Sequence, residues 1–346
     1  MVGAAWTMVF ATAQGHSAER AGTVIGLAAV GRMVADLDRS VAFYKAIGFN
    51  QDLTPDPSWR QDEAIDHLYG VQGMQIRMAK MVVVNAASGQ PFAVYLREWK
   101  GMKRRSLAGH PAWEPGATHF SLVVPDAQSV WSTLAADGML RARSWGARLI
   151  AAPGQSKGTI AYLTDPDGLD IELLNERTPV PNVAGPGTDP DTLPGIGHAG
   201  IVVLDQARAK AFYGEVLGGH PPNSGTPWLK GDFYDSVVGG HGNIMRVYDE
   251  SFPEASAPRS RVNFALIEFQ NRKQPAETVR LTDIGVGYVA FEVQGLDALL
   301  RRAKTAGAVV VSRPGPVTAA NGTRQVMIRD PDVGGFVELV EKPKSP

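Results

Sequence analysis

The apolar and polar positions of the chain repeat one order of elements: a short apolar strand, an acidic residue, an amphipathic helix and a glycine. The copy at residues 195–219 reads GIGHAGIVVLDQARAKAFYGEVLGG. Alternation with period two predicts that His198, Gly200 and Val202 share one face of its strand. Asp205 then opens a helix whose apolar residues recur at helical spacing, and Gly218-Gly219 ends it.

The same order of elements occurs three more times. In the first copy, from Val24, Asp36 opens the helix, and its Phe43-Tyr44 pair recurs 169 positions later as Phe212-Tyr213. Apolar stretches at 74–84 and 91–99 complete a βαβββ unit. The second and fourth copies both end in a hairpin around an Asp-Pro-Asp turn, at 165–167 and 330–332. This pattern indicates that a two-unit ancestor was duplicated.

The pattern predicts an α+β protein of four tandem βαβββ modules, at 23–100, 112–176, 195–272 and 283–342. One helix and four short strands cannot bury both faces of a small sheet, so the modules must pair into two cup-shaped, barrel-like sheets. The concave face of a cup is the natural pocket. Residues 23–176 form the first half and 195–342 the second.

Two segments fall outside the modules. Residues 177–194 are rich in Pro and Gly without periodicity, which predicts a linker. Residues 1–22 form an N-terminal extension whose first charged residue is Glu19 and whose small residues resemble the end of a secretory signal, without its basic start. We expect a disordered or loosely packed extension, for which a truncated signal or a start codon placed too early are the possible origins. The location is predicted to be cytoplasmic, with the periplasm as the alternative if this segment is a truncated signal.

Composition narrows the chemistry. The chain has 346 residues and no cysteine, so disulfides, thiolate metal sites and a cysteine nucleophile are excluded. A metal ion must then be held by histidine, carboxylate or tyrosine oxygen. The formal charge of −1, with both signs interspersed, predicts neither nucleic acid nor membrane as a partner. We expect a small-molecule substrate and a monomer or homodimer.

At this point the chain resembles the vicinal oxygen chelate superfamily, of the glyoxalase, bleomycin resistance protein and extradiol dioxygenase type. The resemblance rests on VADLDRSVAFYKAIGF, DPDGLDIELLN and GHAGIVVLDQARAKAFYGEVLG, and extends over all four modules. Metal-using members carry one ligand in the first strand of a module, seven residues before the acidic residue that opens the helix. A second ligand, a glutamate, lies in the last strand.

These positions are occupied differently in the four modules. The resemblance implies His119 and Glu172 in the second module, and His198 and Glu268 in the third, as ligands of one divalent ion: zinc, nickel, manganese or ferrous iron. In the first module the positions fall on Ala29 and Leu96, which cannot bind a metal. In the fourth, Tyr288 stands where the histidine would be and Glu338 is retained.

Three functions remain open. The leading one is a metal-dependent lyase or isomerase resembling glyoxalase I, in which the second and third modules pair. The ion chelates two neighbouring substrate oxygens, and Glu172 or Glu268 removes a proton to give an enediolate. The second is an extradiol-type dioxygenase with Fe(II), in which modules pair sequentially and a site of His198, Glu338 and Tyr288 or Glu268 is conceivable. The third is a metal-free protein that binds or sequesters a small molecule.

Each candidate also has a structural interpretation. A histidine in a strand is commonly a core residue hydrogen-bonded to backbone, and the two glutamates that follow the Asp-Pro-Asp turns could persist by descent. Tyr288 is expected to serve packing or to donate a hydrogen bond to substrate, with Glu338 beside it as a substrate contact. The basic run Lys100, Lys103, Arg104 and Arg105 is a solvated loop or a clamp for an anionic substrate.

Overall fold

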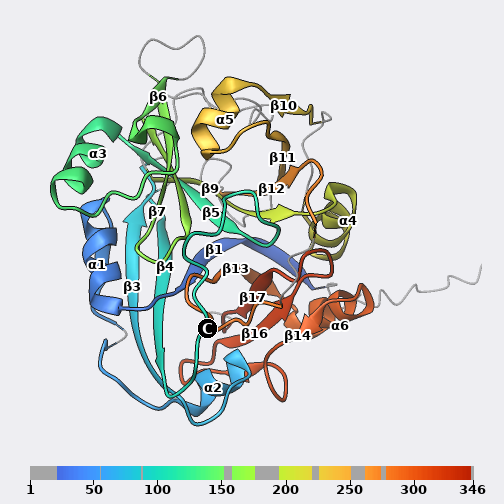
Figure 1. Ribbon diagram of the computed structural model, residues 1–346. Helices are drawn as coiled ribbons and strands as arrows, with labels where there is room; N and C mark the ends of the chain where they lie inside the picture. Colours follow the sequence, from blue (N-terminus) through green and yellow to red (C-terminus); the bar gives the residue numbers. More distant parts are fainter. Residues whose placement is uncertain are drawn as a thin grey trace, which may run out of the picture.

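The structure is a computed structural model (Figure 1). It describes residues 22–54, 56–86, 89–151, 158–175, 195–219, 226–250, 262–273 and 278–343. The predicted N-terminal extension, except for its last residue, and the predicted linker therefore lie outside the described residues. Within those ranges, no helix has the length and apolar character that a membrane span requires.

The strands form two large sheets. The first contains, in spatial order, β14 (Val309–Val310), β16 (Arg324–Arg329), β17 (Phe336–Glu341), β13 (Gly287–Gln294), β1 (Thr23–Met33), β4 (Pro91–Lys100), β3 (Gln75–Val84) and β2 (Asn50–Asp52), with β15 (Val317–Thr318) on β16. The second contains β10 (Leu229–Lys230), β11 (Ile244–Glu250), β12 (Asn263–Phe269), β9 (Gly195–Val203), β5 (Thr118–Val124), β8 (Asp170–Asn175), β7 (Thr159–Thr164) and β6 (Ile150–Ala151).

The order of strands shows which modules pair. The first sheet joins the first and fourth modules through the antiparallel pair β1 and β13, and the second joins the second and third through β5 and β9 (Figure 1). The predicted α+β fold of paired modules is confirmed, and so is the pairing on which the leading hypothesis depends. Sequential pairing is wrong. We call the concave faces of the two sheets the 1/4 cup and the 2/3 cup.

The main helices begin where the acidic residues predict. The side chains of Asp36, Asp126 and Asp205 accept hydrogen bonds from backbone amides in the first turns of α1 (Leu37–Ala46), α3 (Ala127–Ala136) and α4 (Gln206–Lys210), which continues as a π-helix (Ala211–Val216). In the fourth module Gly295 precedes α6 (Leu296–Thr305), and the carboxylate of Glu341 accepts from the amides of Gly295 and Leu296 instead.

Within each half of the chain, the Asp-Pro-Asp turn of one module contacts the neighbouring module, which lies in the other sheet. Asp165 accepts a hydrogen bond from the hydroxyl of Tyr44 on α1 at 3.2 Å, and Asp167 pairs with Arg39 at 2.9 Å. In the second half Asp332 accepts from the amide of Leu204 and pairs with Arg208, both at 2.8 Å. Modules adjacent in sequence are therefore joined by these turns, whereas modules that share a sheet come from different halves.

Two short helices cover the cups. Leu68 and Tyr69 of α2 (Glu63–Tyr69) pack in the 1/4 cup, and Val237 and Val238 of α5 (Asp232–Val238) pack in the 2/3 cup. Each helix is held to the opposite module by a serine, since Ser312 donates to the Leu68 carbonyl at 2.8 Å and Ser144 to the Val237 carbonyl at 2.7 Å. A 3-10 turn (Trp145–Ala147) lies beside α5. The repeat pattern did not predict these helices.

Candidate metal centre

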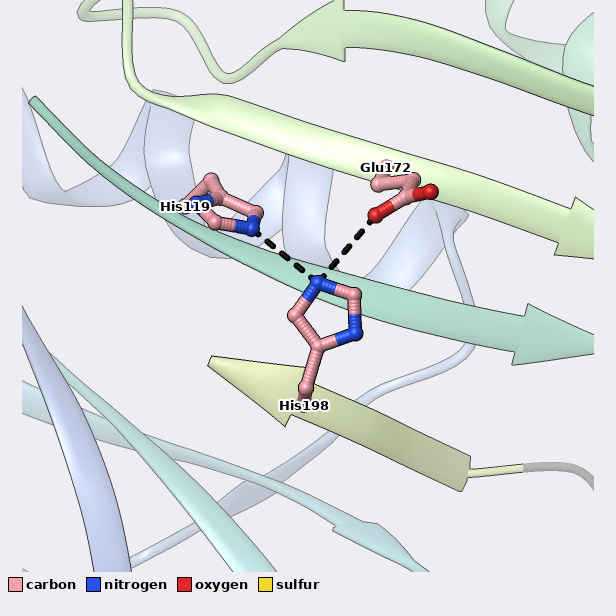
Figure 2. Close-up of side chains that lie close together, drawn as sticks. All are labelled: His119, Glu172 and His198. Atoms are coloured by element: carbon pink, nitrogen blue, oxygen red, sulfur yellow. Dashed lines mark hydrogen bonds and ion pairs between the residues drawn. The ribbon is translucent and has the colours of Figure 1, made fainter. Parts of the chain in front are cut away.

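Three predicted ligands meet in the 2/3 cup. His119 lies on β5, Glu172 on β8 and His198 on β9, and these strands are neighbours in the order β9, β5, β8. Their side chains point toward one another (Figure 2). One ligand atom from each residue lies within 4.8 Å of the other two. The residues come from two modules, so module pairing creates the cluster.

The distances suit a shared ion. The Nε2 atoms of His119 and His198 are 3.0 Å apart, and His198 Nε2 is 3.2 Å from Glu172 Oε2 (Figure 2). Two ligand atoms that each lie about 2.1 Å from an ion, at an angle of about 90–109°, are about 3.0–3.4 Å apart. The two imidazole rings are nearly perpendicular, at 70°. They therefore direct ring nitrogens to one point without stacking.

Burial prepares the site for a cation. His119, Glu172 and His198 are 3 %, 5 % and 5 % exposed. Burial lowers the pKa of His119 well below its usual value, and the neighbouring His198 and Arg32 lower it further. His119 is therefore neutral at pH 7 and offers a lone pair. The neutral imidazole of His119 brings no charge to compensate the buried carboxylate of Glu172, and a divalent ion would supply one.

Neighbouring residues fix the geometry. Ser121 accepts a hydrogen bond from the backbone amide of His198 at 2.8 Å, which holds β9 against β5 beside the site. Gly200 faces the His119 ring, and a Cβ there would lie 2.5 Å from His119 Cε1 and 2.6 Å from the Ala265 carbonyl oxygen. Any side chain at position 200 would therefore displace the His119 ring.

Comparison with known proteins agrees with this geometry. The sequence pattern of the Glyoxalase/Bleomycin resistance protein/Dioxygenase superfamily matches residues 195–335. This match covers the third module and most of the fourth. The fold is similar over most of the chain to that of glyoxalase I from Zea mays, which shares 17 % identity, with 92 % of each chain covered and a TM-score of 0.56.

Two further solved structures are similar over different lengths. A glyoxalase family protein from Bacillus cereus shares 22 % identity over 41 % of this chain and 89 % of its own, with a TM-score of 0.35. A mutant of 4-hydroxymandelate synthase from Streptomyces coelicolor shares 13 % identity over 93 % and 94 %, with a TM-score of 0.29. No curated protein matches the sequence.

Glu268, the expected fourth ligand, lies elsewhere. Its carboxylate accepts from the amide of Gln206 at 2.9 Å and pairs with Arg246 at 2.6 Å, at the start of α4. In the first module Glu98 does the same at the start of α1, accepting from the Leu37 amide at 2.8 Å. The expectation that Glu268 completes the cluster is therefore corrected. It failed because β12 is apolar on both faces, so that alternation did not reveal which face Glu268 occupies.

The ladder register identifies the true fourth position. Glu172 lies opposite Ser121, two residues after His119, and Ala265 lies opposite Gly200, two residues after His198. Ala265 therefore occupies in the third module the position of Glu172 in the second. Among the described residues, the superfamily's ligand positions of this cup hold two histidines, one glutamate and one alanine.

The 1/4 cup has lost its ligand set. Register places Tyr288, Ala29 and Glu338 at the positions of His119, His198 and Glu172, and Tyr95 at that of Ala265. Tyr95, not the expected Leu96, is the second position of the first module. Because Tyr288 and Glu338 lie in the other sheet, the hypothetical site that combined them with His198 is wrong. Their expected contact with substrate at the metal site is not supported by this placement.

The guanidinium group of Arg97 lies in the 1/4 cup. The Arg97 guanidinium carbon is 5.0 Å from the centre of the Tyr95 ring and 5.3 Å from those of Tyr69 and Tyr288. Burial raises the pKa of Glu338, and Arg97 offsets part of that rise. Sequence reasoning missed Arg97, although its place between Tyr95 and Trp99 on a cup strand was a usable signal.

One other feature of the cluster, Tyr162, was not predicted. Tyr162 on β7 lies opposite Glu172 in the ladder and stacks on His119, with ring centres 6.1 Å apart. Burial raises the pKa of Tyr162 well above its usual value, and Glu172 raises it further, so its hydroxyl stays protonated.

The basic run at residues 100–105 has a structural role in part, since Arg104 donates a hydrogen bond to the Val34 carbonyl at 2.8 Å.

Proposed function

We propose that this protein is a metal-dependent enzyme in which His119, Glu172 and His198 hold one divalent ion. The convergence of their three ligand atoms within 4.8 Å carries the proposal. The donors fit such an ion, because two imidazole nitrogens and one carboxylate oxygen suit zinc, nickel, manganese or ferrous iron. When bound, the ion supplies Lewis-acid chemistry to two neighbouring oxygens of a small substrate, and ferrous iron adds oxygen chemistry.

The ligand count favours one reaction class. Two histidines and one carboxylate that leave adjacent positions open are typical of non-haem ferrous oxygenases. Ala265 offers no fourth donor, and the separate base expected from Glu268 is absent from the cup. We therefore place a dioxygenase acting on a substrate with two neighbouring oxygens, such as a catechol, ahead of the lyase or isomerase.

The residues of the chain have distinct tasks in this proposal. His119 and His198 orient lone pairs, and Glu172 supplies the negative charge that selects a cation. Tyr162 keeps its proton and can donate a hydrogen bond next to Glu172. The surrounding apolar residues, Val202, Val238 and Ile267 among them, exclude bulk water.

An isomerase remains the second candidate because Glu172 is a carboxylate already in the cluster. Its oxygen, 3.2 Å from His198 Nε2, could take a proton from a substrate carbon next to a chelated oxygen. In this case one residue must serve as both ligand and base. Tyr162 would then stabilise the protonated carboxyl by hydrogen bonding.

The test compares both activities on protein stripped of metal and reloaded with Fe(II), Zn(II) or Ni(II). A dioxygenase consumes oxygen with catechol only when Fe(II) is loaded, and His119→Ala and Glu172→Gln lose at least about 100-fold in rate. Glu268→Gln, a carboxylate outside the cup, is the matched control and keeps the rate. Turnover of a hemithioacetal without oxygen would instead establish the isomerase. If protein that holds far less than one ion per chain binds the small molecules as tightly as metal-loaded protein does, both enzyme hypotheses are wrong.

A further inference from the structure

A large cavity lies outside the metal cluster. It has a volume of about 410 Å³ and is lined by the turn at 330–332, by residues 168–170 that follow the other Asp-Pro-Asp turn, and by the segments that connect the modules within each half. It therefore lies where the two halves of the chain meet. A second cavity, of about 10 Å³, contacts His119 and shares Ala117, Thr118 and Asp170 with it. A volume of about 300–1,000 Å³ is typical of sites for small organic ligands.

Part of the wall of this cavity is apolar. Side chains that line it include Leu169, Val286, Val333 and Phe336, all nearly buried. Burying an apolar ligand against such a wall stabilises the complex by about 25 cal/mol per Å² of apolar surface removed from water. The cavity thus suits the apolar body of a ligand.

The charged groups of the wall are mostly neutralised within the protein. Arg143 pairs closely with Asp170 and also donates to the carbonyl oxygens of His110 and Gly168. The imidazole of His110 pairs closely with Glu114. Asp332 is paired with Arg208 at 2.8 Å. None of these groups needs a ligand for charge compensation.

Arg329 differs from the other cations of the wall. It stacks on Phe336, with its guanidinium carbon 4.4 Å from the ring centre, and donates one hydrogen bond to the Val279 carbonyl. Within the described ranges no carboxylate lies in ion-pair distance of it. Burial lowers the pKa of Arg329, and the neighbouring Asp330 carboxylate raises it. A guanidinium has five N–H donors in a planar fork that matches a carboxylate, so several remain available.

A difference between the two halves of the chain explains why Arg329 has no ion-pair partner. By alignment of the Asp-Pro-Asp turns, Arg329 of the fourth module occupies the position of Thr164, and Gly335 that of Asp170. In the second module Arg143 forms an ion pair with Asp170, whereas no such pair of Arg329 is found among the described residues. The Asp330 carboxyl, next to Arg329 in sequence, lies in the same wall. Gly334, whose φ is 73°, also leaves the space next to the Arg329 guanidinium free of a side chain.

We propose that this cavity binds a small apolar carboxylate whose anionic end pairs with Arg329. The site requires no metal ion and extends beyond the function proposed above. The carboxylate accepts hydrogen bonds from the free edge of the guanidinium, and the apolar body contacts Val286, Val333 and Phe336. Because the cavity adjoins the small cavity at His119, a bound ligand lies next to the metal cluster.

The test uses trans-cinnamate and its neutral, nearly isosteric amide, trans-cinnamamide, titrated calorimetrically into the full chain in the presence of a chelator. We expect cinnamate to bind at least about 10-fold more tightly than the amide, because only the carboxylate forms a charge-assisted pair with the guanidinium. Arg329→Gln should remove this preference while binding of the amide changes less than about twofold. Arg329→Lys should keep part of it, and thermal unfolding checks that both variants are folded.

Two controls separate this site from others. Arg301→Gln, an exposed arginine on α6, and His198→Ala, in the metal cluster, should bind cinnamate as the wild type does. The proposal is overturned if cinnamate does not bind at millimolar concentration, if the amide binds equally well, or if Arg329→Gln keeps the preference. Equal loss in His198→Ala would place the anion at the metal cluster and would also overturn it. Metal content of the same proteins reports on the metal centre independently.

Discussion

Replacement of Gly200 by alanine should displace His119 and thereby weaken metal binding without touching a ligand. The added Cβ would lie 2.5 Å from His119 Cε1, whereas ordinary contacts begin at 3.4 Å, so the ring must move by about 0.9 Å. The backbone cannot yield instead, because the same Cβ would lie 2.6 Å from the Ala265 carbonyl oxygen on the paired strand β12.

The size of the effect follows from this displacement. Overpacking of a close-packed site costs about 1–3 kcal/mol of stability. Loss of an orienting interaction around a ligand lowers metal affinity about 10–100-fold, and a shift of almost 1 Å in one of three ligands acts in the same way. We therefore expect Gly200→Ala to bind Zn(II) about 10–100-fold more weakly, with a modest decrease in the free energy of unfolding.

The assay is competition with a chromogenic chelator of known affinity, combined with chemical denaturation of the metal-free protein. Gly315→Ala is the matched control, since a Cβ at Gly315 meets nothing within 4 Å. Unchanged zinc affinity in a folded Gly200→Ala protein would refute the reasoning, because it would mean that the position of the His119 ring does not matter for the ion.

Three more predictions follow from other parts of the structure. Arg97→Met should lose about 3–5 kcal/mol of unfolding free energy, because Glu338 is left buried without its cation, and adding Glu338→Gln should restore part of the loss. Burial raises the pKa of Asp330 to about 6 from 3.8, so its contribution to stability is present below pH 4 and is lost as the pH rises through 6. Asp330→Asn should therefore gain up to about 3 kcal/mol relative to the wild type between pH 4 and pH 7 in denaturation curves, and an equal difference at both values would contradict this. Glu268→Gln should destabilise the start of α4 by about 0.5–2 kcal/mol and leave the metal content unchanged, whereas loss of metal would return Glu268 to the site.

The fold was largely predictable because its signals are local. Asp36, Asp126 and Asp205 mark helix starts by their own side-chain hydrogen bonds, and the recurring Phe-Tyr and Asp-Pro-Asp pairs reveal four modules. The pairing of modules was not local, and it was predicted only because two modules shared ligand-capable residues. That the second and third modules share a sheet agrees with this argument.

The candidate site was predictable in three of its four positions. His119, Glu172 and His198 stand out as polar residues in apolar strands, and strand register brings them together. Glu268 is polar in an apolar strand for a different reason, as it faces the start of a helix. Sequence alternation cannot separate the two cases when both faces of a strand are buried.

The remaining features depend on contacts between distant segments. Arg97 becomes a cation enclosed by aromatic rings only where β4 and β13 meet α2, and the cavity at Arg329 forms only where the second and fourth modules meet the segments that connect the modules. No spacing along the chain encodes either arrangement. The short helices α2 and α5 have seven residues each, too few for a periodic pattern to emerge.

The central claim is that one ion is held by His119, Glu172 and His198, and metal content tests it most directly. Wild type and His198→Ala are purified in parallel without chelators, loaded with the same metal, dialysed, and measured by mass spectrometry with elemental detection. The account predicts close to one ion per chain for the wild type and a loss of most of it in His198→Ala. Unchanged occupancy in the folded variant, or far less than one ion in the wild type, would contradict the account.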